Sequence, residues 1–257
     1  MMPQTDMATL QEVVFRAGGI FADAASAAQV HVKGPADFVT DVDLSVQRFL
    51  ACKLPELLPG SQLMSEEKDN ASIDFGGDVW ILDPVDGTTN LIHNFCHSAV
   101  SLALVRGGVC VAGIVYNPFS REMFSAEKGG GAFLNGTRLH VSAAAHLSDA
   151  LVAMGTTPAA RAQADLYFAR MRRVFDACHD IRRIGAASLE LSYIAAGRLD
   201  GYCEDGLKPW DYAAGLLLLQ EAGGTITALD GAPLGWTCQS GVAASNGAIH
   251  AELLKLL

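Results

Sequence analysis

The stretch from residue 78 to about residue 141 constrains the fold most, because nearly all of it is typical of β-strands. VWILD is a short apolar run, and AVSLALVRGGVCVAGIVYNP predicts two strands joined at Gly107-Gly108. REMFSAEK alternates between apolar and polar residues, and Asn135-Gly136 within FLNGTRLHV is a strong hairpin signal. A sheet built from these strands has to bury at least one face, so we expect helices to cover it.

The remaining sequence supplies those helices. Apolar residues recur at helical spacing from Leu10 to Phe21, and a second helix is expected after Asp43, ending near Pro59-Gly60. After about residue 145 helix and strand alternate. Helices are predicted for ARMRRVFDAC, SLELSYIAAG, DYAAGLLLLQEAGG and AIHAELLKLL, and strands for GYCED, TITALDG and SGVAASN.

These patterns predict an α/β (α+β) chain of layered helices and sheets. With 257 residues and no internal repeat or linker, it is expected to form one domain over 1–257, with subdomains of approximately 1–145 and 146–257. The formal net charge of -10 argues against nonspecific nucleic-acid binding, which relies on Lys and Arg, but leaves open a local basic patch formed by the arginines between positions 170 and 183. The six cysteines contain no CxxC pair, and no secretory signal or membrane span is recognised. We therefore expect a cytoplasmic protein with no membrane contact.

The segment Asp83-Pro84-Val85-Asp86-Gly87-Thr88-Thr89-Asn90 carries the strongest chemical signal. Two carboxylates three residues apart at the end of an apolar strand repel each other unless a cation lies between them. Gly87 lets the backbone approach a ligand closely, and a helix starting near Thr88 would present N–H groups to an anion. Carboxylates that can bind a metal, next to backbone amides that can bind phosphate, suit phosphoryl transfer. On its own, the segment is equally compatible with an Asp-Pro turn followed by a helix cap.

Acidic residues in three further segments gain meaning beside this one. Ser65-Glu66-Glu67 follows the short run QLM and alone would be a solvated surface pair. Asp211, in WDYAAG, and Asp43, in TDVD, could each simply cap a helix. A helix cap and a metal ligand are compatible roles for Asp211.

The segments DFVTDVD, SEE, WILDPVDGTTN and KPWDYAAG, in this order and spacing, resemble the inositol monophosphatase family. The resemblance covers nearly the whole chain, and RRIGAASLELSYIAAGRLDGYCED is similar to its bacterial branch. It implies a layered αβαβα sandwich and a homodimer. Ser65 departs from the glycine usual in the family before the two glutamates, and we expect a slightly altered loop that still binds metal.

The resemblance also implies roles for individual residues. Mg²⁺ is expected at two or three sites: a first ion would be held by Glu66, Asp83 and the carbonyl of Val85, and a second by Asp83, Asp86 and Asp211. A weaker third ion would touch Glu66, with Glu67 nearby. Hard oxygen ligands of this kind suit Mg²⁺.

Catalytic and substrate-binding residues follow from the same resemblance. Asp43 and Thr88 would orient the attacking water, Glu66 would place the first ion, and Asp86 would return a proton to the leaving alkoxide. The amides of Gly87 and Thr88 would hold the phosphate. The pocket for the alcohol part of the substrate would be lined by Gly185, Ala187, Glu204 and Thr156.

We therefore expect a Mg²⁺-dependent, lithium-sensitive phosphatase that hydrolyses a small phosphate monoester by direct attack of a metal-activated water. Inositol monophosphate is the expected substrate. The alternatives are histidinol phosphate, fructose 1,6-bisphosphate and 3'-phosphoadenosine 5'-phosphate, or a role in binding RNA or the transcription machinery on the same fold. A scaffold whose metals serve only structure is a further alternative.

Three other features are better explained by structure. His93 and His97 have the spacing of a helical zinc pair but lack a third ligand. Gly129-Gly130-Gly131 is followed by no Lys-Ser or Lys-Thr pair, so a hairpin turn is expected there. The arginines between positions 170 and 183 are expected to form a solvated helix face or a subunit contact.

Overall fold

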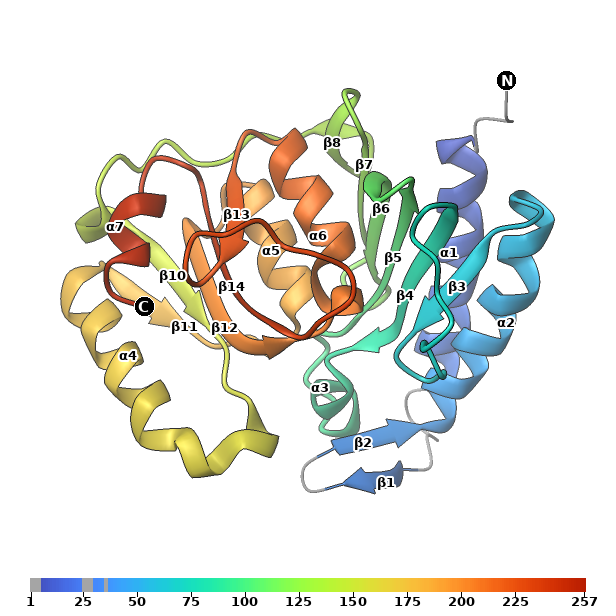
Figure 1. Ribbon diagram of the computed structural model, residues 1–257, viewed down its shortest axis with the longest axis horizontal. Helices are drawn as coiled ribbons and strands as arrows, with labels where there is room; N and C mark the ends of the chain where they lie inside the picture. The colour runs from blue at the N-terminus through green and yellow to red at the C-terminus, as the bar shows by residue number, and fades with distance from the viewer. Residues whose placement is uncertain (1–5, 25–29, 35–36) are drawn as a thin grey trace.

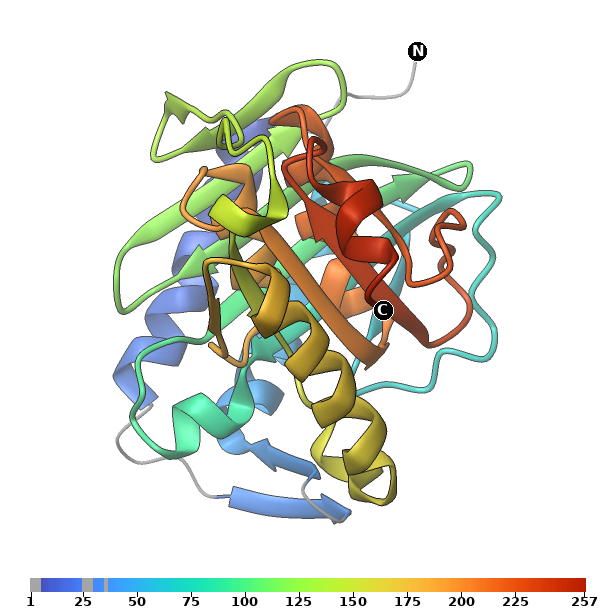
Figure 2. The same cartoon turned by 90° about the vertical axis from the view of Figure 1, so that its left-hand side faces the viewer.

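The computed structural model describes residues 6–24, 30–34 and 37–257. Its architecture is five layers, in which two large sheets alternate with three layers of helices (Figure 1). The view turned by 90° looks along the stack, with the helices that cover the smaller sheet nearest the viewer (Figure 2). The predicted layered fold is therefore confirmed.

The larger sheet has seven strands in the order β3-β4-β5-β6-β7-β8-β9. Only β3 and β4 run parallel; every other neighbouring pair is antiparallel. The hairpin predicted at Asn135-Gly136 joins its last two strands. The strand bounds are β3 Gln62–Ser65, β4 Asp78–Asp86, β5 Ala99–Arg106, β6 Val109–Asn117, β7 Glu122–Glu127, β8 Gly131–Leu134 and β9 Thr137–Arg138.

Two helices, α1 (Met7–Ala24) and α2 (Asp41–Leu57), cover the outer face of this sheet. Their apolar stripes bury Leu10, Phe21 and Leu50 against Trp80 of β4. The start of α2 differs from the prediction. Thr40 is the cap, and Asp43 lies three residues inside the helix, where its carboxylate accepts a hydrogen bond from the Thr40 N–H.

The middle layer consists of α5 (Ala187–Ala195) and α6 (Pro209–Glu221), which pack between the two sheets. Because both helices have sheet on two sides, α6 is apolar nearly all round. Gly113 of β6 allows a close approach: a Cβ at this position would lie 2.9 Å from the carbonyl oxygen of Ala214. This contact fixes α6 against the larger sheet.

The smaller sheet has five strands in the order β11-β10-β12-β14-β13. Its outer face is covered by α4 (Ala164–Ala177) and α7 (His250–Leu254), with a third small core between them. A two-stranded hairpin, β1 (Val30–Gly34) and β2 (Asp37–Thr40), lies below α3 (Thr88–Ile92) and was not predicted. The strands of the smaller sheet are β10 Leu151–Met154, β11 Asp180–Arg182, β12 Gly201–Leu207, β13 Thr225–Ala228 and β14 Ser240–Ser245.

Two of the three features assigned to structure, the His93/His97 spacing and the glycine run, keep that explanation. The third expectation is only partly right, because Arg172 is exposed but Arg170 is largely buried in an ion pair with Asp205. The helix α3 ends at Ile92, so His93 and His97 do not form a helical pair, and His97 instead contacts the carbonyl of Phe95. The glycine run at 129–131 forms the turn between β7 and β8. In the described part of the chain, no helix has the length and apolar character to cross a bilayer. The division into subdomains stays a prediction.

Candidate active site

The carboxyl end of β4 positions the first two acidic residues. Asp83 and Asp86 are buried, and the pairing of β4 with β5 shifts register between them. Asp83 Oδ1 accepts a hydrogen bond from the Val85 N–H at 3.0 Å. Asp86 Oδ2 accepts from both the N–H and the hydroxyl of Ser188, at 2.7 and 2.5 Å. The strand therefore ends in a tight turn whose carboxylates are fixed from two sides.

Gly87 links this turn to α3. Its φ of 86° lies in the left-handed region, and a Cβ would lie 3.0 Å from the carbonyl oxygen of His97 and 3.1 Å from the Cβ of Ala186. The next residue, Thr88, begins α3, as predicted. Only glycine meets both the conformation and the space available here.

Asp43 and Thr88 come from different elements and meet at this turn. The Thr88 hydroxyl lies 3.3 Å from Asp43 Oδ1 and 3.0 Å from the carbonyl oxygen of Val85. Asp43 Oδ2 accepts from the N–H and the hydroxyl of Thr40, so its other oxygen faces Thr88 in a fixed position. Burial raises the pKa of Asp43, and the bonds from Thr40 oppose that rise. The hydroxyl and the carboxylate are therefore held side by side.

Glu66 and Asp211 approach from two other elements. Glu66 follows β3, and its N–H donates to the carbonyl of Leu82 on β4. The preceding Ser65 is fully buried, and its hydroxyl donates to Gln47 at 2.6 Å, which fixes the loop. Asp211 lies in the first turn of α6, where Oδ2 accepts from the Lys208 N–H at 2.6 Å. The N-cap residue of this helix is Lys208, and not Asp211 as the sequence suggested. Asp211 is the third helical residue, and its carboxylate bonds to the backbone of the cap.

The carboxylates act on one another electrostatically. The pKa of Asp83 is raised well above its usual value, first by burial and then by repulsion from Glu66, Asp86 and Asp211. Burial and the charges of Asp86 and Glu66 likewise raise the pKa of Asp211. Burial also raises the pKa of Asp86, against the opposing effect of the Ser188 hydrogen bonds. The four acids predicted as metal ligands therefore act on one another in one region, in which Asp83 and Asp86 are buried and Glu66 and Asp211 are partly exposed.

This donor set fits a hard divalent cation, because buried carboxylates that repel each other are stabilised by positive charge. The fit is not that of a finished site. Within residues 6–24, 30–34 and 37–257, no three His, Cys, Asp or Glu side chains are arranged, as they stand, to hold a metal ion. Asp83, Asp86 and Asp211 each have one oxygen engaged by a neighbouring donor. Their other carboxylate oxygens are the ones that would bind a cation.

The predicted pocket residues border the same turn on the side of the smaller sheet. Gly185, with φ 86°, lies beside Asn90, whose side chain donates to the carbonyls of Ile184 and Gly185. Ala187 begins α5 and is buried. Glu204 lies on β12 and accepts a hydrogen bond from the Tyr202 hydroxyl at 2.6 Å. Burial raises the pKa of Glu204 to about 7.

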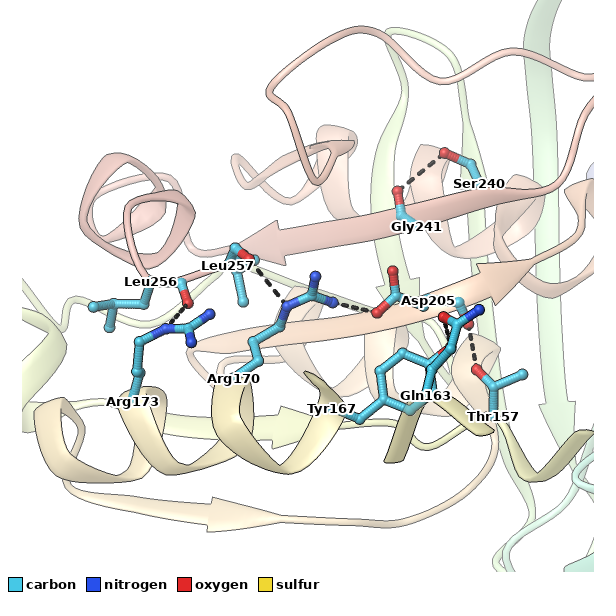
Figure 3. A network of polar contacts seen from close by, with 10 residues as sticks. All are labelled: Thr157, Gln163, Tyr167, Arg170, Arg173, Asp205, Ser240, Gly241, Leu256 and Leu257. Carbon is cyan, nitrogen blue, oxygen red and sulfur yellow. Dashed lines mark hydrogen bonds and ion pairs between the residues drawn. The ribbon is translucent and has the colours of Figure 1, made fainter. Parts of the chain in front are cut away.

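Beyond Glu204, a polar network fixes β12 to α4 (Figure 3). Arg170 of α4 forms an ion pair with Asp205 and also donates to the carbonyl oxygen of Leu257. Thr157 donates to the carbonyl oxygen of Asp205 at 2.7 Å. Beside the network lies a cavity of about 360 Å³ lined by Tyr167, Asp205 and their neighbours. These contacts tie the strand that carries Glu204 to α4 and to Thr157.

Sequence reasoning missed three residues at the site. Arg183 lowers the pKa of Asp86 and of Glu204, and its guanidinium donates to the Thr156 hydroxyl at 3.1 Å. Ser188 holds Asp86, and Glu190 is a fully buried acid on α5. The only sequence signal for Glu190 was a lone acid in an otherwise apolar helix. Arg183 was hidden in a run of arginines that was assigned to the surface.

Comparison with known proteins agrees with this geometry. The model of the inositol monophosphatase family matches residues 2–257. An inositol-1-monophosphatase of Rhizobium meliloti (strain 1021) is 45% identical over 203 residues, 79% of this chain and 76% of the relative. The Nus factor SuhB of Escherichia coli (strain K12) is 40% identical over 209 residues, 81% of this chain and 77% of the relative.

The extragenic suppressor protein suhB of Bartonella henselae has a similar solved structure. Its TM-score is 0.91 at 36% identity, with 97% of each chain covered. The resemblance inferred from the motifs is thus confirmed across the whole chain. This chain belongs to the inositol monophosphatase family and is a metal-dependent phosphatase.

Proposed function

We propose that the chain hydrolyses inositol monophosphate with two or three Mg²⁺ ions as cofactors. The observation that carries this proposal is that the buried Asp43, Asp83 and Asp86 lie at the Gly87-Thr88 turn, while Glu204 is partly exposed. Glu66, Asp83, the Val85 carbonyl, Asp86 and Asp211 are the proposed ligands. The ions would neutralise the acids, lower the pKa of the attacking water and stabilise the leaving oxygen.

The chain's own residues would place the reacting groups. Backbone N–H groups of Gly87 and Thr88, at the start of α3, would hold the phosphate. The Thr88 hydroxyl and the Asp43 carboxylate would orient the attacking water and accept its proton. Asp86 would deliver a proton to the departing alkoxide. Glu204 would accept hydrogen bonds from the hydroxyls of the alcohol, and Gly185, Ala187 and Thr156 would shape the space around it.

A substrate panel tests the proposal. Phosphate release would be measured with inositol 1-phosphate, histidinol phosphate, fructose 1,6-bisphosphate and 3'-phosphoadenosine 5'-phosphate at equal concentration, with and without Mg²⁺. We expect the highest kcat/KM for the inositol phosphate, no turnover after chelation, and inhibition by lithium. A higher kcat/KM for any of the other three would replace the proposed substrate while leaving the phosphatase assignment in place.

A role in RNA binding or with the transcription machinery is a second candidate, supported by the 40% identity to a protein named Nus factor SuhB. The net charge of -10 works against contact with RNA. A gel shift with RNA, repeated at increasing salt, would reveal such binding. Its absence together with phosphate release would leave catalysis as the function.

Assembly and location belong to the same proposal. Exposed apolar side chains on α4, namely Leu166, Phe168 and Phe175, would suit a subunit contact, and we infer a homodimer. Light scattering would measure its mass. All six cysteines are free thiols, which suits the reducing cytoplasm.

A further inference from the structure

The side chain of Glu204 is fixed by two neighbours that no resemblance assigned. Tyr202, two residues earlier on β12, is fully buried, and its hydroxyl donates to Glu204 Oε2 at 2.6 Å. Residues two apart on a strand project from the same face of the sheet, so the ring of Tyr202 and the side chain of Glu204 lie next to each other. In the described part of the chain, the Tyr202 hydroxyl is the one hydrogen-bond donor to the Glu204 side chain.

Gly155 provides the second constraint. It follows β10, and its N–H donates to the Cys203 carbonyl at 2.9 Å, so it lies directly beside the strand of Glu204. A Cβ at this position would come within 1.8 Å of Glu204 Oε2 and 1.9 Å of its Cδ. The φ of Gly155 is not in the left-handed region, so its backbone would accept a side chain. Glycine is required here only because the Glu204 carboxylate occupies the space.

We propose that Tyr202 and Gly155 are positioning residues that set the selectivity of the site for hydroxyl-bearing alcohols, by holding Glu204 in one orientation. Tyr202 occupies Oε2, which leaves Oε1 as the acceptor for a hydroxyl of the substrate. The missing side chain at Gly155 keeps the carboxylate from being displaced. Neither residue is among the proposed metal ligands or phosphate-binding residues. This inference rests on the proposed function, because it assumes that Glu204 binds the alcohol.

The geometry predicts an effect confined to substrates with hydroxyl groups. A phosphate ester whose organic part carries no hydroxyl groups has nothing to donate to Glu204. The binding of such a substrate therefore does not depend on the orientation of that carboxylate. Inositol 1-phosphate and p-nitrophenyl phosphate therefore form a matched pair of probes. Both carry the same reacting phosphate, and only the first has hydroxyls on its alcohol.

The experiment compares the Mg²⁺-loaded wild-type enzyme with Tyr202→Phe and Gly155→Ala. Tyr202→Phe keeps the buried ring and removes only the hydroxyl. In each variant we expect kcat/KM for inositol 1-phosphate to fall about tenfold, mostly through KM, since a hydrogen bond to a charged group is lost or misplaced. The kcat/KM for p-nitrophenyl phosphate should stay within about twofold of wild type. Equal losses on both substrates would overturn the proposal, because they would indicate a general structural defect.

A double-mutant cycle separates positioning from independent effects. If Tyr202 acts through Glu204, Tyr202→Phe should cause no further loss on inositol 1-phosphate when Glu204→Gln is already present. Additive losses would contradict the proposal. Failure of the proposed function would look different. If the wild-type enzyme hydrolysed p-nitrophenyl phosphate but not inositol 1-phosphate, the proposed substrate would be wrong. Both variants should then match wild type on p-nitrophenyl phosphate.

Discussion

The Thr88 hydroxyl lies 3.3 Å from Asp43 Oδ1, although 45 positions separate the two residues in the chain. Asp43 is held by the capping box of α2, and Thr88 by the first turn of α3, so each partner is fixed by a helix start. Because the two helix starts meet, the Thr88 hydroxyl and the Asp43 carboxylate have a fixed orientation relative to each other. That pair lies directly beside the carbonyl of Val85.

Thr88→Val should lower kcat strongly. The substitution keeps the shape of the side chain and removes the hydroxyl that would orient the attacking water, and general-base machinery typically contributes about 10²–10⁴-fold. We expect a kcat loss in that range with KM changed less than about threefold, measured by phosphate release. Thr89→Val is the matched control, because Thr89 is the next residue on the same helix and is exposed. Equal kcat values for the two variants would rule out the role given to Thr88.

Asp83→Asn should have opposite effects on activity and on the stability of the metal-free protein. Asp83 is repelled by Glu66, Asp86 and Asp211, so removing its charge relieves repulsion when no cation is bound. We expect a higher Tm than wild type in the presence of chelator. With Mg²⁺, the Tm increase seen in wild type should shrink and hydrolysis should fall at least about 100-fold.

Asp78→Asn is the control for Asp83, because Asp78 lies at the other end of β4 and pairs with Arg106. Its loss should lower Tm slightly and leave the Mg²⁺ response intact. If Asp83→Asn kept the full Mg²⁺-dependent rise in Tm, Asp83 would not be a metal ligand.

Much of this site followed from the sequence because the signals were local. The apolar run before Asp83 predicts the end of a strand, and Gly87 indicates a backbone position that excludes side chains. The exact helix starts at Asp41 and Pro209 did not follow, because an acid at the third helical position looks the same in sequence as an acid at the cap. Such positions are decided by which backbone N–H the carboxylate reaches.

The contribution of Arg183 and Glu190 could not be predicted from their own neighbourhoods. Arg183 belongs to a run of surface-like arginines, and only the packing of β11 against β10 brings it to Thr156. Glu190 acquires its character from burial between α5 and the smaller sheet. Long-range packing of this kind is invisible to spacing and composition, because it depends on which strands become neighbours.

Glu190 should make the stability of the protein pH-dependent. Burial raises its pKa to about 8, its Oε1 accepts from the Ile184 N–H, and its Oε2 has no partner in the described structure. Because the folded-state pKa lies above the unfolded value near 4.5, the folded protein binds this proton more tightly. The stabilisation that the folded protein gains from protonated Glu190 is therefore fully present below about pH 4.5 and is lost as pH rises to about 8. Above that pH the charged form costs about 3–5 kcal/mol.

Glu190→Gln should remove this pH dependence. In chelator, the free energy of unfolding of the variant should exceed that of wild type at pH 9 and lie within about 1 kcal/mol of it at pH 5. Denaturant titrations at both values measure the difference. Glu12→Gln, an exposed change on α1, serves as control and should follow wild type at both pH values. A constant offset between Glu190→Gln and wild type would show that the carboxyl does not titrate in this range.

Gly87→Ala tests the turn that joins the acids to the phosphate-binding amides, and Gly60→Ala is its matched control. Both glycines have nearly the same left-handed φ, 86° and 85°, so either substitution should cost about 1–2 kcal/mol of folding free energy from backbone strain. Only at Gly87 does a Cβ meet neighbouring atoms, whereas at Gly60 nothing lies within 4 Å. Gly87→Ala should therefore lose additional stability and most of its phosphate release, while Gly60→Ala keeps wild-type kcat. Loss of activity in both variants would mean that destabilisation alone inactivates the enzyme, and the turn would then have no specific part in binding phosphate.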